Sequence, residues 1–128
     1  MEDSIFTKII KGEVPANKVY EDELTLAFLT IMPIQPGHTL VIPKKQIDHL
    51  WDLSDEDYQA VMATAKKVAL RLREVFPEKS RVGVKVVGDE VPHAHVHLMP
   101  FDTVAEYNAP PTPAKPEDLT EIARKLAF

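Results

Sequence analysis

The chain has 128 residues, of which 45% are hydrophobic and 27% charged, with 15 Lys and Arg against 20 Asp and Glu and no cysteine. This length predicts one domain with one core, and no apolar run approaches the ~20 residues that cross a membrane. The formal charge of −5 argues against binding to a nucleic-acid polymer, and the absence of cysteine excludes disulfides, thiolate nucleophiles and Cys-based zinc sites.

The first part of the chain predicts a short helix followed by three strands. The acidic start up to Ser4 does not match a secretory signal, so the cytoplasm is the expected location. Ser4 is a predicted N-cap for an apolar helical stripe, and Gly12 ends that helix. Strands are predicted at residues 18–20, 25–30 and 39–42. Turn residues separate them, which predicts an antiparallel meander.

The second part predicts a long helix and two further strands. Ser54 opens the helix, whose apolar residues repeat at intervals of three and four until Pro77. The strands are predicted at residues 81–87 and 95–99. This order is typical of an α+β fold, a five-stranded antiparallel sheet with two helices packed on one side.

The C-terminal part predicts an extension of this domain. Residues 109–116 are rich in proline and predict a stiff, extended linker, and Pro116 begins a last short helix. We therefore divide the chain into a domain of residues 1–104 and an extension of residues 105–128. The sequence leaves three placements of the extension helix open: over a pocket, on a partner subunit, or on its own domain.

Three histidines, His93, His95 and His97, alternate with apolar residues over five positions. In an extended strand this pattern sends the imidazoles to one face and the apolar residues to the core. Imidazoles at positions i, i+2 and i+4 lie about 6–7 Å apart, close enough to share a phosphate or a metal ion. Because repeated burial of imidazole is costly, the cluster predicts a functional site.

Two chemical interpretations of this cluster remain open at this point. Zinc is commonly bound by neutral imidazole, but three ligands on one straight strand surround a tetrahedral ion poorly, and a flanking carboxylate or a distant fourth ligand is usual. Asp89 or Glu90 could supply such a carboxylate. In phosphoryl chemistry, one imidazole attacks phosphorus while its neighbours neutralise the oxygens. The middle histidine, His95, is then the favoured nucleophile, with its Nδ1–H bonded to a strand carbonyl and Nε2 free.

The segment His93–Met99, His-Ala-His-Val-His-Leu-Met, fits the His-φ-His-φ-His-φ-φ signature of the histidine triad (HIT) family, where φ is an apolar residue. Residues 4–15 and 37–45 also resemble the opening and the second block of its Hint-like branch, so about residues 4 to 102 are covered. The resemblance implies a HIT-like fold, a homodimer, and no required cofactor. It also implies a nucleotidyl hydrolase or transferase that releases nucleoside monophosphate from phosphoramidates, mixed anhydrides or dinucleoside polyphosphates through a nucleotidyl-histidine intermediate.

The resemblance assigns roles to particular residues. His95 is the nucleophile, His93 and His97 orient it and contact the phosphate or the leaving group, and His38 faces the triad. The pocket for a purine nucleotide is expected to be apolar apart from one threonine. It maps onto Ile5, Phe6, Ile9, Val14, Phe28, Thr30, Ile31 and Leu40.

Two features depart from the family pattern. Thr30 stands where Hint-like members generally carry an aspartate that binds the ribose hydroxyls, and the loop of residues 87–92 is several residues shorter than usual. We therefore keep two alternatives to the phosphoramidase-like hydrolase: a protein that binds zinc through histidines, and a nucleotide-binding regulator with negligible turnover.

Overall fold

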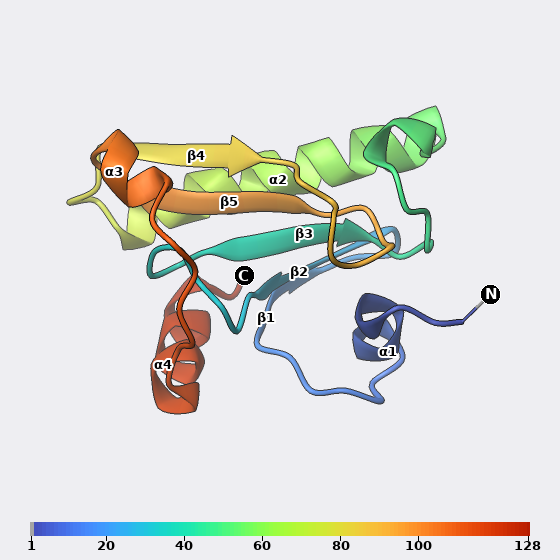
Figure 1. Cartoon of the computed structure of the whole chain (residues 1–128), viewed down its shortest axis with the longest axis horizontal. Coiled ribbons are helices and arrows are strands. Elements are labelled where there is room, and N and C mark those ends of the chain that lie inside the picture. Colours follow the sequence, from blue (N-terminus) through green and yellow to red (C-terminus); the bar gives the residue numbers. More distant parts are fainter. Residues whose placement is uncertain (1) are drawn as a thin grey trace.

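The computed structural model describes residues 2–128 and contains a five-stranded antiparallel sheet in the order β1-β2-β3-β5-β4 (Figure 1). The first three strands form the expected meander, β5 pairs with β3, and β4 is an edge strand. The strands are β1 (Lys18–Glu21), β2 (Thr25–Leu29), β3 (Thr39–Pro43), β4 (Arg81–Lys85) and β5 (Val96–Phe101). The α+β prediction is confirmed.

The helices begin where the sequence predicts. Ser4 Oγ accepts a hydrogen bond from Thr7 N at the start of the first helix, and Ser54 Oγ accepts one from Asp57 N at the start of the longest. The helices are α1 (Ile5–Ile10), the 3₁₀ turn η1 (Leu50–Asp52), α2 (Asp55–Val75), α3 (Val104–Tyr107) and α4 (Pro116–Leu126). The η1 and α3 turns were not predicted, because a single turn is too short to show helical periodicity.

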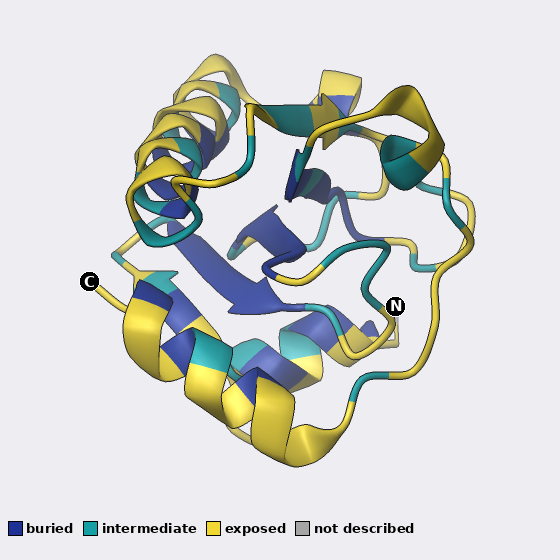
Figure 2. Ribbon diagram, turned by 90° about the vertical axis from the view of Figure 1, so that its left-hand side faces the viewer, coloured by how far each residue is buried: buried dark blue, intermediate teal, exposed yellow. Residues whose placement is uncertain are grey.

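The helices do not all lie on one side of the sheet, so that expectation was wrong. Val41 of β3 belongs to the core that α2 and α4 cover, whereas Leu40 and Ile42 belong to a second core under α1. Strands β2 and β3 are therefore buried on both faces, and they form the dark centre of the molecule in Figure 2. The sequence of α1 shows that it is amphipathic but not which face of the sheet it covers.

The C-terminal extension contacts its own domain, and its residues also line cavities, among them Leu119 of α4 and Pro111 of the linker. Packing on a partner subunit remains a hypothesis. The linker runs beside the loop after β2, where Thr112 N donates to Pro33 O at 3.2 Å and Ala114 N to Ile31 O at 3.2 Å. Helix α4 contacts α2, β1 and β2. The division between residues 104 and 105 remains a prediction. Within residues 2–128, no helix is long and apolar enough to span a bilayer.

Candidate active site

The histidines meet on the α1 face of the sheet, at the beginning of β5. Ala94, Val96 and Leu98 are buried in the core beneath α2, so the alternation predicted from the sequence holds. The strand begins at Val96, one residue after the expected start, so only His97 of the three histidines lies within it. His93 and His95 belong to the segment that leads into β5.

Both ring nitrogens of His93 are bound to the protein. Nε2 lies 2.8 Å from the carbonyl oxygen of Pro43, which only accepts, so Nε2 carries the hydrogen. In the neutral ring Nδ1 then accepts from the Ser4 hydroxyl, whose oxygen is 2.8 Å away. Burial lowers the pKa of His93, and its side chain has no exposed surface. The structure therefore does not bring His93 to a substrate, contrary to the expectation that it contacts the phosphate.

A polar network at the start of α1 holds the Ser4 hydroxyl against His93. The amide oxygen of Gln46 accepts from Ser4 N at 2.7 Å and from the Thr7 hydroxyl at 2.7 Å. Gln46 follows β3 by three residues, so this network joins α1, β3 and the triad. Sequence reasoning identified Ser4 as a cap only, because its partner His93 is 89 residues away along the chain.

His95 has one nitrogen bound and the other free. Its Nδ1 lies 2.8 Å from the carbonyl oxygen of His93, so this nitrogen donates and Nε2 keeps its lone pair. The ring packs edge-on against Phe6, with the centroids 5.1 Å apart. The residue is 6% exposed and lines a cavity. This is the arrangement that the sequence analysis expected for a nucleophile.

His38 and His97 form a hydrogen-bonded pair with a fixed direction. Ile34 N donates to His38 Nδ1 at 3.0 Å, so the hydrogen of the neutral ring is on Nε2, which donates to His97 Nδ1 at 3.0 Å. The hydrogen of His97 is therefore on Nε2. That atom is buried and has no hydrogen-bond partner among the described residues. It is a donor that needs an acceptor.

Burial keeps this pair uncharged. It lowers the pKa of His38 to about 3 and the pKa of His97 to about 4. Neighbouring positive charge, including that of Lys85, adds to the effect in both residues. Both imidazoles are thus neutral at pH 7, and the direction of their hydrogen bond is fixed by the Ile34 amide.

A cavity of about 270 Å³ opens in front of the triad. It is lined by His38, His95 and His97, by Thr30 after β2, by Lys85 of β4 and by Pro111 of the linker. Sequence reasoning missed Lys85 and Pro111, since neither carries a signal apart from its place in the fold. Thr30 also accepts a hydrogen bond from Met32 N at 3.1 Å through its hydroxyl.

Of the predicted nucleoside pocket, only Thr30 lines this cavity. Phe6, Ile9, Phe28 and Leu40 are buried together beneath α1, and Val14 packs at the edge of that core. Ile5 and Ile31 are 44% and 71% exposed. The structure thus places the predicted apolar residues beside the cavity, as core and surface.

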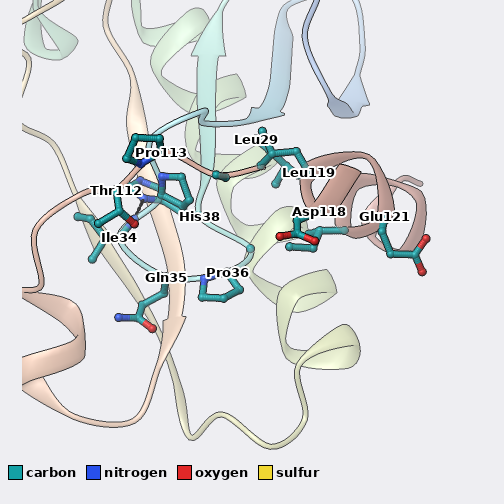
Figure 3. Close-up of a pocket in the computed structure, with 14 residues that line it drawn as sticks. Leu29, Ile34, Gln35, Pro36, His38, Thr112, Pro113, Asp118, Leu119 and Glu121 are labelled. Carbon is teal, nitrogen blue, oxygen red and sulfur yellow. Dashed lines mark hydrogen bonds between the residues drawn. The ribbon is translucent and has the colours of Figure 1, made fainter. Parts of the chain in front are cut away.

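A second cavity of about 340 Å³ lies on the other side of His38. Figure 3 shows Gln35 and Pro36 from the loop before β3, and Asp118 and Glu121 from α4, around it. Both cavities are lined by two carboxylates, Asp118 and Glu121 here and Asp89 and Glu90 in the other, but only the other contains a cation, Lys85. This cavity is therefore a poor site for a phosphate, and the cavity in front of His95 and His97 is the better candidate.

The described residues contain no group of three or more His, Asp or Glu side chains placed to hold a metal ion. The hydrogen bonds give the reason: neither ring nitrogen of His93 is free, and Nδ1 of His95 and of His97 is already bonded. The donor set of this conformation does not fit a zinc ion bound by the whole triad.

Residues 11–104 match the model of the HIT domain family. The chain is 36% identical to "Protein hit" of Bacillus subtilis, over 98% of this chain and 93% of that protein. It is 34% identical to the adenosine 5'-monophosphoramidase hnt1 of Schizosaccharomyces pombe, over 96% of this chain and 95% of that protein.

Solved structures give the same result. A Hit-like protein from Bartonella henselae superposes with a TM-score of 0.86 at 35% identity, covering 97% of this chain and 93% of that one. A Zn-bound histidine triad family protein from Mycobacterium smegmatis superposes with a TM-score of 0.81 at 30% identity, covering 95% of this chain and 88% of that one.

Proposed function

This chain belongs to the HIT domain family, and on that premise we propose that it is a hydrolase of nucleotide conjugates with a nucleotidyl-histidine intermediate on His95. One observation carries the proposal: His95 and His97 line a single cavity, His95 Nε2 keeps a lone pair, and His97 Nε2–H has no partner among the described residues. Attack on phosphorus requires a nucleophile and a donor to the developing negative charge. The similarity to a yeast monophosphoramidase supports the same chemistry.

In the first step, His95 Nε2 attacks the α-phosphorus and the bond between phosphorus and the leaving group breaks. The leaving group departs with the bonding electron pair: a phosphate or carboxylate leaves as the anion, and an amine takes up a proton from water as it departs. In the second step, water attacks the phosphorus of the nucleotidyl-histidine, the bond between phosphorus and Nε2 breaks, and the proton of the water passes to solvent. Nucleoside monophosphate and free His95 result. The centroids of the His95 and His97 rings are 5.0 Å apart, so one phosphate can contact both.

The remaining histidines act through these two. His97 Nε2–H donates to a phosphate oxygen, and His38 keeps that hydrogen on Nε2 by donating to Nδ1. His93 acts as a positioning residue, because its carbonyl oxygen holds His95 Nδ1–H while its ring is fixed by Ser4 and Pro43. Thr30 is the residue of the proposed purine-nucleotide pocket that already faces the cavity.

We also propose a homodimer formed through β4. This strand is at the edge of the sheet, and Val84, Val86 and Val87 at and beyond its end are 53%, 44% and 60% exposed. An apolar edge strand with no further strand beside it favours pairing with a second copy. Light scattering is expected to give twice the chain mass of 14.4 kDa.

The deciding experiment is mass spectrometry of intact protein quenched after mixing with an adenosine phosphoramidate. An added adenylyl mass is expected in the wild type and is expected to be absent in His95→Ala. Binding of AMP by His95→Ala within about tenfold of wild type separates loss of the nucleophile from loss of the fold. AMP binding by the wild type with neither adduct nor turnover would instead identify a regulator, and turnover abolished by a chelator would identify a zinc enzyme.

A further inference from the structure

Lys85 is a cation within the candidate active site that the mechanism above does not use. It is the last residue of β4 and lies opposite His97 of β5 in the antiparallel register. Directly opposed residues on neighbouring strands direct their side chains to the same face. Lys85 therefore stands beside His97 on the α1 face, and it lines the same cavity.

Tyr107 of α3 fixes the position of the Lys85 ammonium group. Nζ lies 4.3 Å from the centre of the Tyr107 ring and donates to the Tyr107 carbonyl oxygen at 3.4 Å. The Tyr107 hydroxyl in turn donates to Val84 O at 2.7 Å. The ring lies on β4 over Gly83, where a Cβ atom would collide with it. Gly83 thus leaves room for the Tyr107 ring, and Tyr107 holds the ammonium group of Lys85 in place.

Lys85 has no carboxylate partner among residues 2–128, since none lies within ion-pair distance of its Nζ. Asp89 and Glu90 also line the cavity, but both are exposed, so water screens their charges more than that of the half-buried lysine. The imidazoles of His38 and His97 are neutral at pH 7, because burial lowers the pKa of each. A cation without a carboxylate partner in such a cavity attracts an anion.

The sheet register shows which part of a substrate meets this cation. Phe28 of β2, Leu40 of β3, His97 of β5 and Lys85 of β4 are opposed in turn and form one row across the sheet. Phe28 and Leu40 are covered by α1, but the cavity follows the same strand order, from Thr30 after β2, past His38 and His97, to Lys85 of β4. A nucleotide with its nucleoside toward Thr30 and its α-phosphate at His97 directs its leaving group toward Lys85.

We infer that Lys85 binds an anionic leaving group, so that the preferred substrates are nucleotide conjugates whose leaving group is an oxyanion, such as a second phosphate or a carboxylate, and not an amine. This inference rests on the proposed function. During bond cleavage the leaving oxygen gains negative charge, and the Lys85 ammonium stabilises that charge without giving up its proton. Tyr107 is a positioning residue for this interaction.

The test compares Lys85→Met with wild type on two substrates that share the adenylyl group. Diadenosine triphosphate releases anionic ADP, and adenosine phosphoramidate releases ammonia. We expect kcat/KM for diadenosine triphosphate to fall about 10- to 150-fold, the effect of one charge-assisted hydrogen bond. We expect less than about a threefold change for the phosphoramidate, because its leaving group carries no negative charge.

Matched variants separate this role from a structural one. Lys66→Met removes an exposed lysine on α2, away from the cavity, and is expected to change neither rate. Lys85→Arg is expected to restore most of the rate with diadenosine triphosphate. Tyr107→Leu is expected to lower only that rate, and Tyr107→Phe, which keeps the ring, to lower it less. Thermal melting identifies any variant that loses the fold.

Three results would overturn the inference. One is an equal loss on both substrates in folded Lys85→Met, and another is no loss on either. The third is a wild-type protein that hydrolyses the phosphoramidate but not diadenosine triphosphate, which would leave the proposed function intact. By contrast, absence of the adenylyl adduct on His95 with both substrates would contradict the proposed function itself.

Discussion

The two outer histidines of the triad, His93 and His97, are four positions apart in the same alternating pattern, yet the fold uses them differently. Every nitrogen of His93 is bound to the protein, and its side chain has no exposed surface. His97 has one nitrogen bound to His38 and one buried N–H without a partner. The comparison teaches that the role of an imidazole depends on which of its nitrogens the structure leaves free.

The difference comes from the elements that surround each ring. The beginning of α1 covers His93 and brings the Ser4 hydroxyl to its Nδ1. No such element covers His97, whose neighbours across the sheet are Leu40 and Lys85. One end of the triad is thus part of the core, and the other faces the cavity.

The largest expected effect comes from removing the unpartnered donor. We expect His97→Ala to lower kcat/KM about 10²- to 10³-fold, as measured for loss of one donor to a developing negative charge. Steady-state kinetics with an adenosine phosphoramidate measures it. The control is His49→Ala, whose side chain is 72% exposed and which is expected to keep full activity. A kcat/KM for His97→Ala within threefold of the wild-type value would contradict the proposed role of the His97 Nε2–H donor.

His93, at the other end of the triad, is expected to contribute mainly to the stability of the fold. His93→Ala leaves the Ser4 hydroxyl and the Pro43 carbonyl without their partner and opens a cavity, so we expect a loss of about 2–4 kcal/mol in the free energy of unfolding. Urea denaturation measures this loss. The activity of the folded fraction is expected to fall less than in His97→Ala. An unchanged urea midpoint would show that the bonds of His93 contribute nothing to stability.

Stability is also expected to depend on pH through the His38–His97 pair. Burial lowers the pKa of His38 to about 3 and the pKa of His97 to about 4, so between about pH 6.5 and pH 4 the unfolded chain binds protons that the folded chain does not. The free energy of unfolding therefore has its full value above about pH 6.5 and decreases as the pH is lowered. At pH 5 the expected loss is up to about 2 kcal/mol for each of the two histidines.

Urea denaturation from pH 8 to pH 5 measures this pH dependence. His38→Asn is expected to flatten the profile, because one of the two coupled residues no longer titrates. The control variant is His49→Asn, which removes an exposed histidine outside this pair. A variant His38→Asn with the wild-type slope would show that the pair does not control acid sensitivity.

The smallest expected effect concerns the caps of the two principal helices. Ser4→Ala removes the cap of α1 and the partner of His93, whereas Ser54→Ala removes the cap of α2 alone. We expect about 1 kcal/mol for Ser54→Ala and about 2 kcal/mol for Ser4→Ala in the free energy of unfolding. Equal losses in thermal or urea unfolding would indicate that the Ser4–His93 hydrogen bond is not stabilising.

Much of the fold follows from patterns within short stretches of the sequence. Ser4 and Ser54 begin helices as predicted, Pro77 limits α2, and the alternation around His95 places its apolar neighbours in the core. Even the His95 Nδ1–H bond to a carbonyl was predictable, because the acceptor is only two residues away. Such features depend on backbone geometry and on neighbours within a few positions.

The rest required the tertiary structure, because its partners are distant in the chain. Ser4 is hydrogen-bonded to His93, which is 89 positions further along the chain. His38 and His97 are 59 positions apart, and the Ile34 amide fixes the tautomer of His97 through its hydrogen bond to His38. Packing likewise decides which face of the sheet α1 covers and places the Lys85 ammonium group on the Tyr107 ring. The sequence by itself determined which residues are able to do chemistry, whereas the fold decided which of their nitrogens are free, since a hydrogen bond consumes a donor or acceptor only where the packed chain supplies its partner.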